Sequence, residues 1–401
     1  MLEATCAHHA ALDLERALRA AERAVLLAAE VCRTVRARGR ALVAHAKPDT
    51  SPVTLADLAS QAVITRVLAD ELGSDFGGSD LVAEEDARWL GDPEQSRELE
   101  LVTEVARGAL PGLRAAEVVD LVSRSQRDPA TASHWLVDPL DGTKGYLRGG
   151  QYSVAIALVE NGRPIVGVLG CPALALDAEV DHLDAEGSLY AAVVGRGVTE
   201  QRCVLGSEAD PLPHLEPASR AAPVLTCSFE PGHQDDEALA LVAAEIGAYP
   251  RLVRVDSALK YVLVARGDAD AYLRLCPRPG SVDYAWDHAA GSLIASEAGA
   301  CVTDLGGRPL GFSCGRCLAG AGGIVAARPE LYGRLLAALA RLGVGRGATR
   351  DLTAPSLASC ARSAAEWRPA HRGRCLGPLR VAVAEACARG AAARRSPPTP
   401  G

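Results

Sequence analysis

The segment W-L-V-D-P-L-D-G-T-K-G (residues 135–145) decides the fold, because it joins a short hydrophobic strand to a tight acidic turn. Val137 ends the hydrophobic run, and the proline that follows Asp138 stiffens the backbone. We therefore expect Asp138 and Asp141 at a strand end, with the carbonyl of Leu140 free between them. Two carboxylates and a carbonyl are hard oxygen ligands of the kind that Mg²⁺ prefers.

Three more segments place carboxylates where they do not look like solvated surface. They are S-P-V-T-L-A-D (51–57), A-E-E-D (83–86) and W-D-H-A-A-G (286–291). Each alone has an ordinary interpretation, as a helix cap, a solvated acidic pair or a turn. Acids without a lysine or arginine partner would repel one another unless a cation lay between them. Together they predict one metal site built from distant segments.

The length of 401 residues allows two domains, and 48% hydrophobic with 23% charged residues is typical of a globular protein. The sequence has no apolar run of membrane-spanning length and no signal-peptide pattern at its start. We expect an intracellular protein, cytoplasmic or, if a leader precedes this chain, organellar. The 12 cysteines lack framework spacing and are expected as reduced thiols. Cys314-x-x-Cys317 reads as a loop with two thiols, and a redox role for it stays open.

Charge divides the chain at about residue 345. Residues 346–401 hold ten arginines against three acids, a net charge of +7, so the first 345 residues carry −15 of the overall −8. We expect an α+β domain over 1–220, a smaller α/β domain over 221–345 and a basic, poorly ordered tail over 346–401. The tail has no aromatic interleaving or folded basic face, so no nucleic-acid partner is expected.

Periodicity predicts the main elements of both domains. Thr54 with Asp57 three residues later predicts a capped helix start, with Asp57 in the first turn. Asn161-Gly162 predicts the turn of a hairpin. The remaining expected elements are helices at 14–35, 94–123, 237–246, 258–266 and 287–299, and strands at 134–137, 153–159, 164–169, 224–227, 252–255, 302–303 and 323–327.

As a set, D-P-L-D-G-T, the downstream W-D-H-A-A-G and the upstream acidic pair resemble the inositol monophosphatase superfamily, over about residues 14–335. The resemblance implies a layered αβαβα sandwich of the inositol monophosphatase and fructose-1,6-bisphosphatase type, with the active site between the domains. Within that superfamily, residues 141–152 and D-S-A-L-K-Y (256–261) look like the 3′(2′),5′-bisphosphate nucleotidases. Inositol monophosphatases usually have Asn-Phe where this chain has Gly145 and Tyr146.

The resemblance implies a role for each matched acid. Asp57 and Thr143 would form the activating pair, in which the Thr143 hydroxyl, polarised by Asp57, takes a proton from the water that attacks phosphorus. Two or three Mg²⁺ ions would neutralise charge on the phosphate. The implied metal ligands are Glu84, Asp138, the Leu140 carbonyl, Asp141 and Asp287.

The substrate side follows from the same resemblance. Thr143, Ser257, Lys260 and Arg274 would meet the nucleotide and the phosphate that is not cleaved. The chain has only three lysines, and Lys260 suits a compact charge on phosphate. Its ordinary interpretation is a solvated helical residue.

Four other polar residues near these motifs are less decisive. Lys144 and Arg148 stay open between loop charges and substrate contacts, while packing or capping is the preferred interpretation of His233 and His288. The segment 230–233 departs from the relatives, so adenine recognition is less well supported than hydrolysis.

The expected reaction is hydrolysis of the 3′-phosphate of 3′-phosphoadenosine 5′-phosphate to AMP and phosphate, with its sulfated form as a second substrate. The resemblance also implies sensitivity to lithium and a role in sulfur metabolism. We expect a monomer or weak dimer with a small-molecule partner. The alternatives are an inositol monophosphatase or inositol polyphosphate 1-phosphatase, and an inactive nucleotide-binding sensor.

Overall fold

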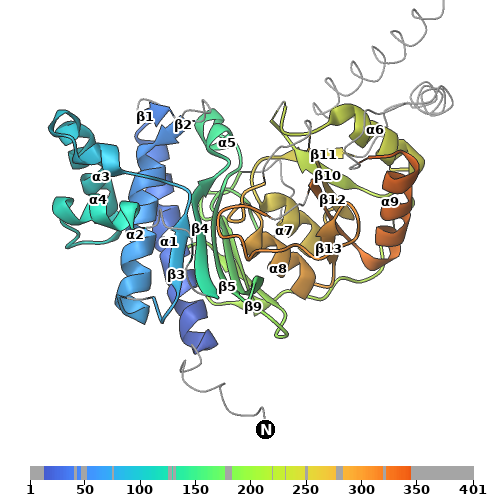
Figure 1. The fold of residues 1–401 in the computed structure, drawn as a ribbon, viewed down its shortest axis with the longest axis horizontal. Coiled ribbons are helices and arrows are strands. Elements are labelled where there is room, and N and C mark those ends of the chain that lie inside the picture. The colour runs from blue at the N-terminus through green and yellow to red at the C-terminus, as the bar shows by residue number, and fades with distance from the viewer. Residues whose placement is uncertain are drawn as a thin grey trace, which may run out of the picture.

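Five alternating layers of helix and sheet make up the molecule (Figure 1), which confirms the αβαβα class predicted from the sequence. From one end to the other they are a helical layer, a seven-stranded sheet, a central helix pair, a five-stranded sheet and an outer helix pair. The computed structural model describes residues 13–39, 43–46, 52–74, 76–124, 129, 132–176, 183–218, 220–230, 232–248, 252–276, 283–318 and 322–344.

The first layer is built around α1 (Leu14–Ala37) and α2 (Leu55–Leu72), preceded by the short ribbon of β1 (Val43–Ala46) and β2 (Pro52–Thr54). Almost every residue of α2 is buried, because α1 and the two outer helices surround it. Those outer helices are α3 (Ser96–Ala109) and α4 (Ala115–Ser123), after the 3₁₀ turns η1 (Arg88–Gly91) and η2 (Pro93–Gln95). The helical stretch predicted at 94–123 is thus interrupted, because proline and a positive-φ glycine follow Leu110.

The seven-stranded sheet has the order β3-β4-β5-β6-β7-β8-β9. β3 and β4 run parallel and the other neighbours antiparallel. The predicted hairpin is confirmed, since Asn161 and Gly162 both have positive φ between β5 and β6. The strands are β3 (Asp80–Ala83), β4 (Ser133–Asp141), β5 (Ser153–Glu160), β6 (Arg163–Cys171), β7 (Ser188–Val193), β8 (Val198–Arg202) and β9 (Asp210–Pro211). The helix α5 (Thr143–Arg148) lies between β4 and β5.

The central layer consists of α7 (Leu259–Ala265) and α8 (Ala289–Glu297), which lie between the two sheets in Figure 1. Beyond them the five-stranded sheet has the order β11-β10-β12-β14-β13, with β10 parallel to both of its neighbours. Its strands are β10 (Leu225–Ser228), β11 (Leu252–Val255), β12 (Ala271–Leu275), β13 (Cys301–Asp304) and β14 (Gly323–Ala327). The outer pair is α6 (Asp236–Glu245) and α9 (Pro329–Arg341).

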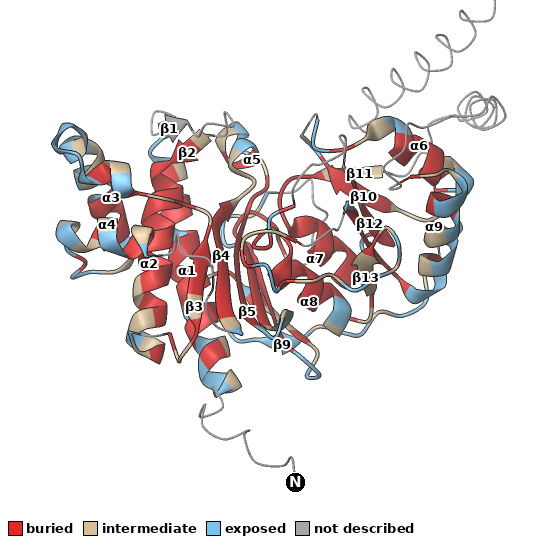
Figure 2. Ribbon diagram, viewed as in Figure 1, coloured by how far each residue is buried: buried red, intermediate tan, exposed pale blue. Residues whose placement is uncertain are grey.

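Three apolar cores hold the five layers together, visible as buried elements in Figure 2. One lies between α1, α2 and the large sheet, the second around α7 and α8, and the third between the five-stranded sheet and the outer pair. Large aromatic side chains such as Trp135, Tyr190 and Tyr272 are almost completely buried in the first two. Burial on both faces fixes each sheet against its helices.

The domain boundaries predicted near residues 220 and 345 stay predictions. The last strand of the large sheet ends at Pro211 and the first strand of the small sheet begins at Leu225. The tail at 346–401 and Lys47 lie outside the described residues. Among the residues that are described, no helix combines the length and apolar character that a membrane crossing requires.

Candidate active site

Parallel pairing of β3 with β4 brings the first acids together. Because the carboxyl ends of parallel strands meet at one edge of a sheet, Glu84, which follows β3, lies beside the end of β4. Its amide donates to the Val137 carbonyl at 3.2 Å. The next residue along β4 is Asp138, whose carboxylate accepts from the Leu140 amide at 3.1 Å. The strand predicted to end at Val137 extends to Asp141, with a register irregularity between Asp138 and Asp141.

Asp57 is completely buried at the third position of α2, as its helix-cap pattern predicts. One carboxylate oxygen, Oδ2, accepts from the amide and hydroxyl of Thr54 at 2.8 and 2.5 Å. The other, Oδ1, lies 3.3 Å from the Thr143 hydroxyl. That hydroxyl is also 3.2 Å from the Leu140 carbonyl. The helix cap therefore fixes Asp57 and leaves one of its oxygens facing Thr143.

The turn between Asp141 and Thr143 depends on Gly142, which has φ of 85° and would be strained with any other residue. Asp141 itself is fixed by two groups from outside the turn. Its Oδ2 accepts from the Ser153 hydroxyl at 3.1 Å and from the amide of Ala258, at the start of α7. Asp141 thus joins the end of β4 to the second half of the chain.

The buried acids raise one another's pKa. The pKa of Asp138 is raised well above its ordinary value by burial and by the charges of Glu84, Asp141 and Asp287. Burial and then the charges of Asp141 and Glu84 do the same to Asp287. The pKa of Asp141 is raised by burial, although the charge of Lys260 acts against this shift. These acids carry more negative charge than their protein partners compensate.

A cavity of about 380 Å³ lies where the two halves of the molecule meet. Of the residues expected to form the site, its wall contains Glu84, Asp141, Thr143, Ser257, Lys260, Arg274 and Asp287. Asp57 and Asp138 are buried next to this group: Asp57 contacts the Thr143 hydroxyl, and Asp138 interacts with the charges of the other acids. Acids that lie more than two hundred residues apart in sequence therefore share one cavity.

The donor set of this cavity suits Mg²⁺, because all its candidate ligands are carboxylate or carbonyl oxygens. The raised pKa values of Asp138, Asp141 and Asp287 are the second observation in favour of a cation, since a divalent ion would neutralise their repulsion. In the described part of the chain, no three acidic, histidine or cysteine side chains are already grouped so that they could hold an ion.

Two cations also line this cavity. Lys260 is only 7% exposed, so its interpretation as a solvated helical residue is wrong. Its ammonium donates to the Ser257 carbonyl and lies 3.4 Å from that of Val255. Burial lowers its pKa, and the charge of Asp141 raises it again. The guanidinium of Arg274 pairs with Asp283.

Asp287 and His288 lie directly before α8. The helix expected at 287–299 begins at Ala289, so Asp287 lies just before the helix and not in its first turn. His288 is buried, and its Nδ1 lies 3.0 Å from the Tyr261 hydroxyl. Burial lowers the pKa of His288 to about 3, so its imidazole is neutral at physiological pH. This agrees with packing as the preferred interpretation of His288.

Several wall residues were not foreseen from the sequence. Ser228 ends β10, Glu230 follows it and Asp256 follows the parallel strand β11, a position that favours ligand sites and that the strand pattern would have indicated. Tyr284 is 41% exposed in the wall and stacks on Trp286 at 4.8 Å. No sequence pattern marks Tyr284.

Comparison with known proteins agrees with this geometry. The profile described as "Inositol monophosphatase family" matches residues 13–343. The chain belongs to the inositol monophosphatase family. Among curated members of that family, the "3'(2'),5'-bisphosphate nucleotidase" of Oryza sativa is 36% identical over 340 residues, covering 80% of this chain and 93% of the relative. The protein of the same name from Schizosaccharomyces pombe is 33% identical over 339 residues, covering 82% and 95%.

Solved structures of the inositol monophosphatase family share the fold. The inositol monophosphatase from Anabaena (Nostoc) sp. PCC 7120 matches with a TM-score of 0.53 and 23% identity, covering 82% of this chain and 97% of the other. CysQ from Bacteroides thetaiotaomicron also matches with a TM-score of 0.53, at 24% identity and with coverage of 80% and 100%. At this level of identity the likeness establishes the architecture alone.

Proposed function

We propose that this chain is a magnesium-dependent 3′(2′),5′-bisphosphate nucleotidase that hydrolyses the 3′-phosphate of 3′-phosphoadenosine 5′-phosphate to AMP and phosphate. One observation carries the proposal: acids that follow β3, end β4 and precede α8 line a single cavity that Lys260 and Arg274 line as well. Curated relatives that match over more than nine-tenths of their length carry this activity in their names. The sulfated form of the nucleotide is the second proposed substrate.

In this proposal the metal ligands are Glu84, Asp138, the Leu140 carbonyl, Asp141 and Asp287. Two or three Mg²⁺ ions, when bound, supply positive charge to the phosphate oxygens and lower the pKa of the attacking water. The five ligands come from three separate segments, so their convergence fixes the two halves of the active site relative to each other. The same small-cation site explains the expected sensitivity to lithium.

Thr143 acts as the proton acceptor for the attacking water. Its hydroxyl carries one proton and has two acceptors, Asp57 Oδ1 at 3.3 Å and the Leu140 carbonyl at 3.2 Å. If the Leu140 carbonyl serves as a ligand, the cation withdraws electron density from its oxygen and makes it a weaker hydrogen-bond acceptor, so Asp57 becomes the preferred acceptor. The hydroxyl then donates to Asp57, and its own lone pair receives the hydrogen bond of the water. As the water gives its proton to the Thr143 oxygen, the original hydroxyl proton passes to Asp57 Oδ1, so Thr143 stays neutral.

Ser257, Lys260 and Arg274 bind the nucleotide and the phosphate that stays attached. Ser257 has φ of 64°, an uncommon conformation that presents its backbone carbonyl to the Lys260 ammonium. Both cations have internal partners in the free protein, so phosphate binds by exchanging with these partners. Exchange of this kind favours a doubly charged phosphate over a neutral hydroxyl group.

The cysteines bear on the compartment in which the protein works. All eight described cysteines are free thiols, which agrees with an intracellular, reducing environment, cytoplasmic or organellar. We propose a monomer or weak dimer that acts on a small molecule.

Phosphate release from 3′-phosphoadenosine 5′-phosphate and from inositol 1-phosphate, each with and without Mg²⁺, tests the proposed function. We expect magnesium-dependent turnover with a higher kcat/KM for the nucleotide. Preference for inositol 1-phosphate or inositol 1,4-bisphosphate would make the chain an inositol phosphatase. Tight nucleotide binding without magnesium-dependent turnover would make it an inactive sensor.

A further inference from the structure

Arg148, the last residue of α5, connects the large sheet's active-site turn to the small sheet. Its guanidinium donates to Asp256 Oδ2 at 2.7 Å and also pairs with Glu230. The guanidinium carbon lies 4.7 Å from the centre of the Phe229 ring. All three partners follow the neighbouring strands β10 and β11. One side chain from the first half of the molecule is thus held by one edge of the second.

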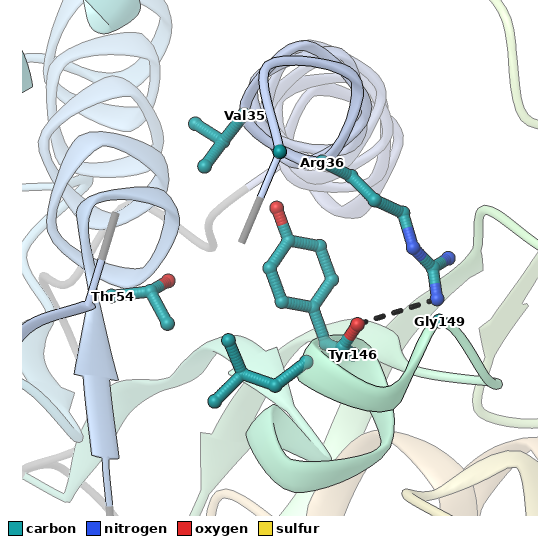
Figure 3. A pocket seen from close by; sticks show the side chains of 7 residues that line it. Val35, Arg36, Thr54, Tyr146 and Gly149 are labelled. Atoms are coloured by element: carbon teal, nitrogen blue, oxygen red, sulfur yellow. Dashed lines mark hydrogen bonds between the residues drawn. The ribbon is translucent and has the colours of Figure 1, made fainter. Parts of the chain in front are cut away.

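The short helix α5, which carries Arg148, is positioned by contacts with the rest of the molecule. α5 has six residues, too few for a stable isolated helix, so its placement depends on tertiary contacts. Figure 3 shows one set of them: the Tyr146 ring points from α5 towards α1, where its hydroxyl donates to the Cys32 carbonyl at 2.8 Å. A small cavity of about 190 Å³ lies beside this contact, and the Arg36 side chain reaches the Tyr146 carbonyl across it at 3.4 Å.

The opposite face of α5 lies directly against the segment Asp256–Ser257. A Cβ atom added at Gly145 would come within 2.5 Å of Asp256 Oδ2, and one added at Gly142 within 3.1 Å of the Ser257 Cβ. The glycines in D-G-T-K-G therefore permit two segments of the chain to touch. Because α5 and Asp256 are packed this closely, displacement of one moves the other.

Charges in this cluster balance. Arg148 and Lys144 from α5 face Glu230 and Asp256 from the small sheet, with Lys144 at 4.0 Å from Glu230. The two acids are mostly buried, with side chains 13% and 9% exposed, while Arg148 is 41% exposed. A planar guanidinium presents its donors to both acids in a fixed fork, whereas an ammonium is a point charge on a flexible stem and would hold them less firmly.

We propose that Arg148 is a positioning residue, which with Asp256 and Glu230 clamps α5 between the two sheets and holds the Thr143 hydroxyl in place beside Asp57. Thr143 begins the helix that Arg148 ends, so a clamp at one end sets the position of the other. The part of this inference that concerns turnover rests on the proposed function of Thr143. The clamp itself is a property of the fold and can be measured without substrate.

Arg148→Gln in the full chain tests the clamp, with Arg341→Gln as the matched control. Arg341 also pairs with a carboxylate, that of Glu245, but it lies on the outer helix α9. For Arg148→Gln we expect kcat for 3′-phosphoadenosine 5′-phosphate to fall about tenfold, with KM changed by less than about twofold, as for a misplaced reacting group. The kcat of Arg148→Lys should lie between those of the wild type and Arg148→Gln, and the kcat of Arg341→Gln should equal that of the wild type.

Hydrogen exchange of the amides of residues 143–148 gives the second readout. We expect exchange to become faster in Arg148→Gln and to stay unchanged in Arg341→Gln. In a double-mutant cycle, Arg148→Gln and Asp256→Asn should be non-additive in the free energy of unfolding, because they remove the same contact.

Three results would overturn the clamp. A raised KM with unchanged kcat would make Arg148 a substrate ligand instead. Unchanged kcat with unchanged exchange would leave it no positioning role, and additive unfolding energies would show that Arg148 and Asp256 are not coupled. If the wild-type chain releases no phosphate from the nucleotide, the proposed function fails, and the exchange and unfolding measurements still decide the clamp.

Discussion

The two walls of the cavity differ in how their charges are satisfied. The acidic wall comprises Glu84 and Asp141, which line the cavity, together with the buried Asp138 and the Leu140 carbonyl. It is built on adjoining parallel strands, and two of its three acids have raised pKa values. The basic wall, formed by Lys260 and Arg274, has internal partners for both cations. A bound cation would therefore stabilise the acidic wall by neutralising its charge. The two cations of the basic wall would instead exchange their internal partners for phosphate oxygens when substrate binds.

The strongest way to break this comparison is to remove one charge from the acidic wall. We expect Asp141→Asn to lower kcat/KM by several powers of ten, about 4 kcal/mol or more of transition-state stabilisation. Phosphate release at saturating Mg²⁺ measures the effect. Asp70→Asn is the control, since Asp70 is an exposed partner of Arg66 on α2. Near-wild-type turnover in Asp141→Asn would exclude Asp141 from the metal site.

The next effect concerns the contact between Asp57 and Thr143. Thr143→Val keeps the shape of the side chain and removes its hydroxyl, so we expect kcat to fall about 100-fold with KM nearly unchanged, the range for a lost proton acceptor. Thr143→Ser keeps the hydroxyl and should retain most of the activity. Steady-state kinetics of both variants measure the effect. Equal kcat values for Thr143→Val and Thr143→Ser would contradict the role assigned to the hydroxyl.

Magnesium should also stabilise the fold in a pH-dependent manner. The folded-state pKa values of Asp138, Asp141 and Asp287 lie above their ordinary values, so their contribution to stability is present at low pH and lost as pH rises through those raised values. Magnesium binds the deprotonated acids, so its stabilisation should grow with pH, reaching about 2.7 kcal/mol at a hundredfold excess over Kd.

Thermal unfolding with and without Mg²⁺ across the acid-to-neutral range measures this linkage. The control is Asp141→Asn, in which the magnesium effect should shrink at every pH. A magnesium effect that is constant with pH, or larger in acid, would contradict the assignment of the acidic wall.

The smallest expected effect lies on the basic wall. Lys260→Met should raise KM for 3′-phosphoadenosine 5′-phosphate about tenfold, in the range of one charge-assisted hydrogen bond. Lys144→Met, which removes the exposed lysine of the same cavity, should change KM less. With 3′-AMP, which lacks the 5′-phosphate, wild type and Lys260→Met should have similar KM values. A tenfold difference with 3′-AMP as well would place Lys260 on the phosphate that is cleaved.

Local patterns made much of the fold predictable. The cap at Thr54, the Asn161-Gly162 turn and the helical periodicity of 14–35 each depend on neighbouring residues, and the structure contains all three. The acids of the site were foreseeable because their segments are unusual as a set. Gathering of Glu84, Asp141 and Asp287 at one cavity required the order of the strands, which the sequence pattern does not provide by itself.

Other features were beyond sequence reasoning. Burial of Lys260 depends on packing of α7 between the sheets, and a lysine in a helix gives no local sign of that. The pairing of Arg148 with Glu230 and Asp256 joins residues that are 82 and 108 positions apart. Such contacts arise where two sheets meet, and only the three-dimensional arrangement reveals them.

Anomalous diffraction from crystals of the full chain soaked in Mn²⁺, a substitute for Mg²⁺, tests the convergence of the acids most directly. We expect peaks between Glu84, Asp138, the Leu140 carbonyl, Asp141 and Asp287, and their loss in Asp141→Asn. Catalytically active protein whose manganese peaks lie away from these oxygens would contradict the acidic wall as the metal site.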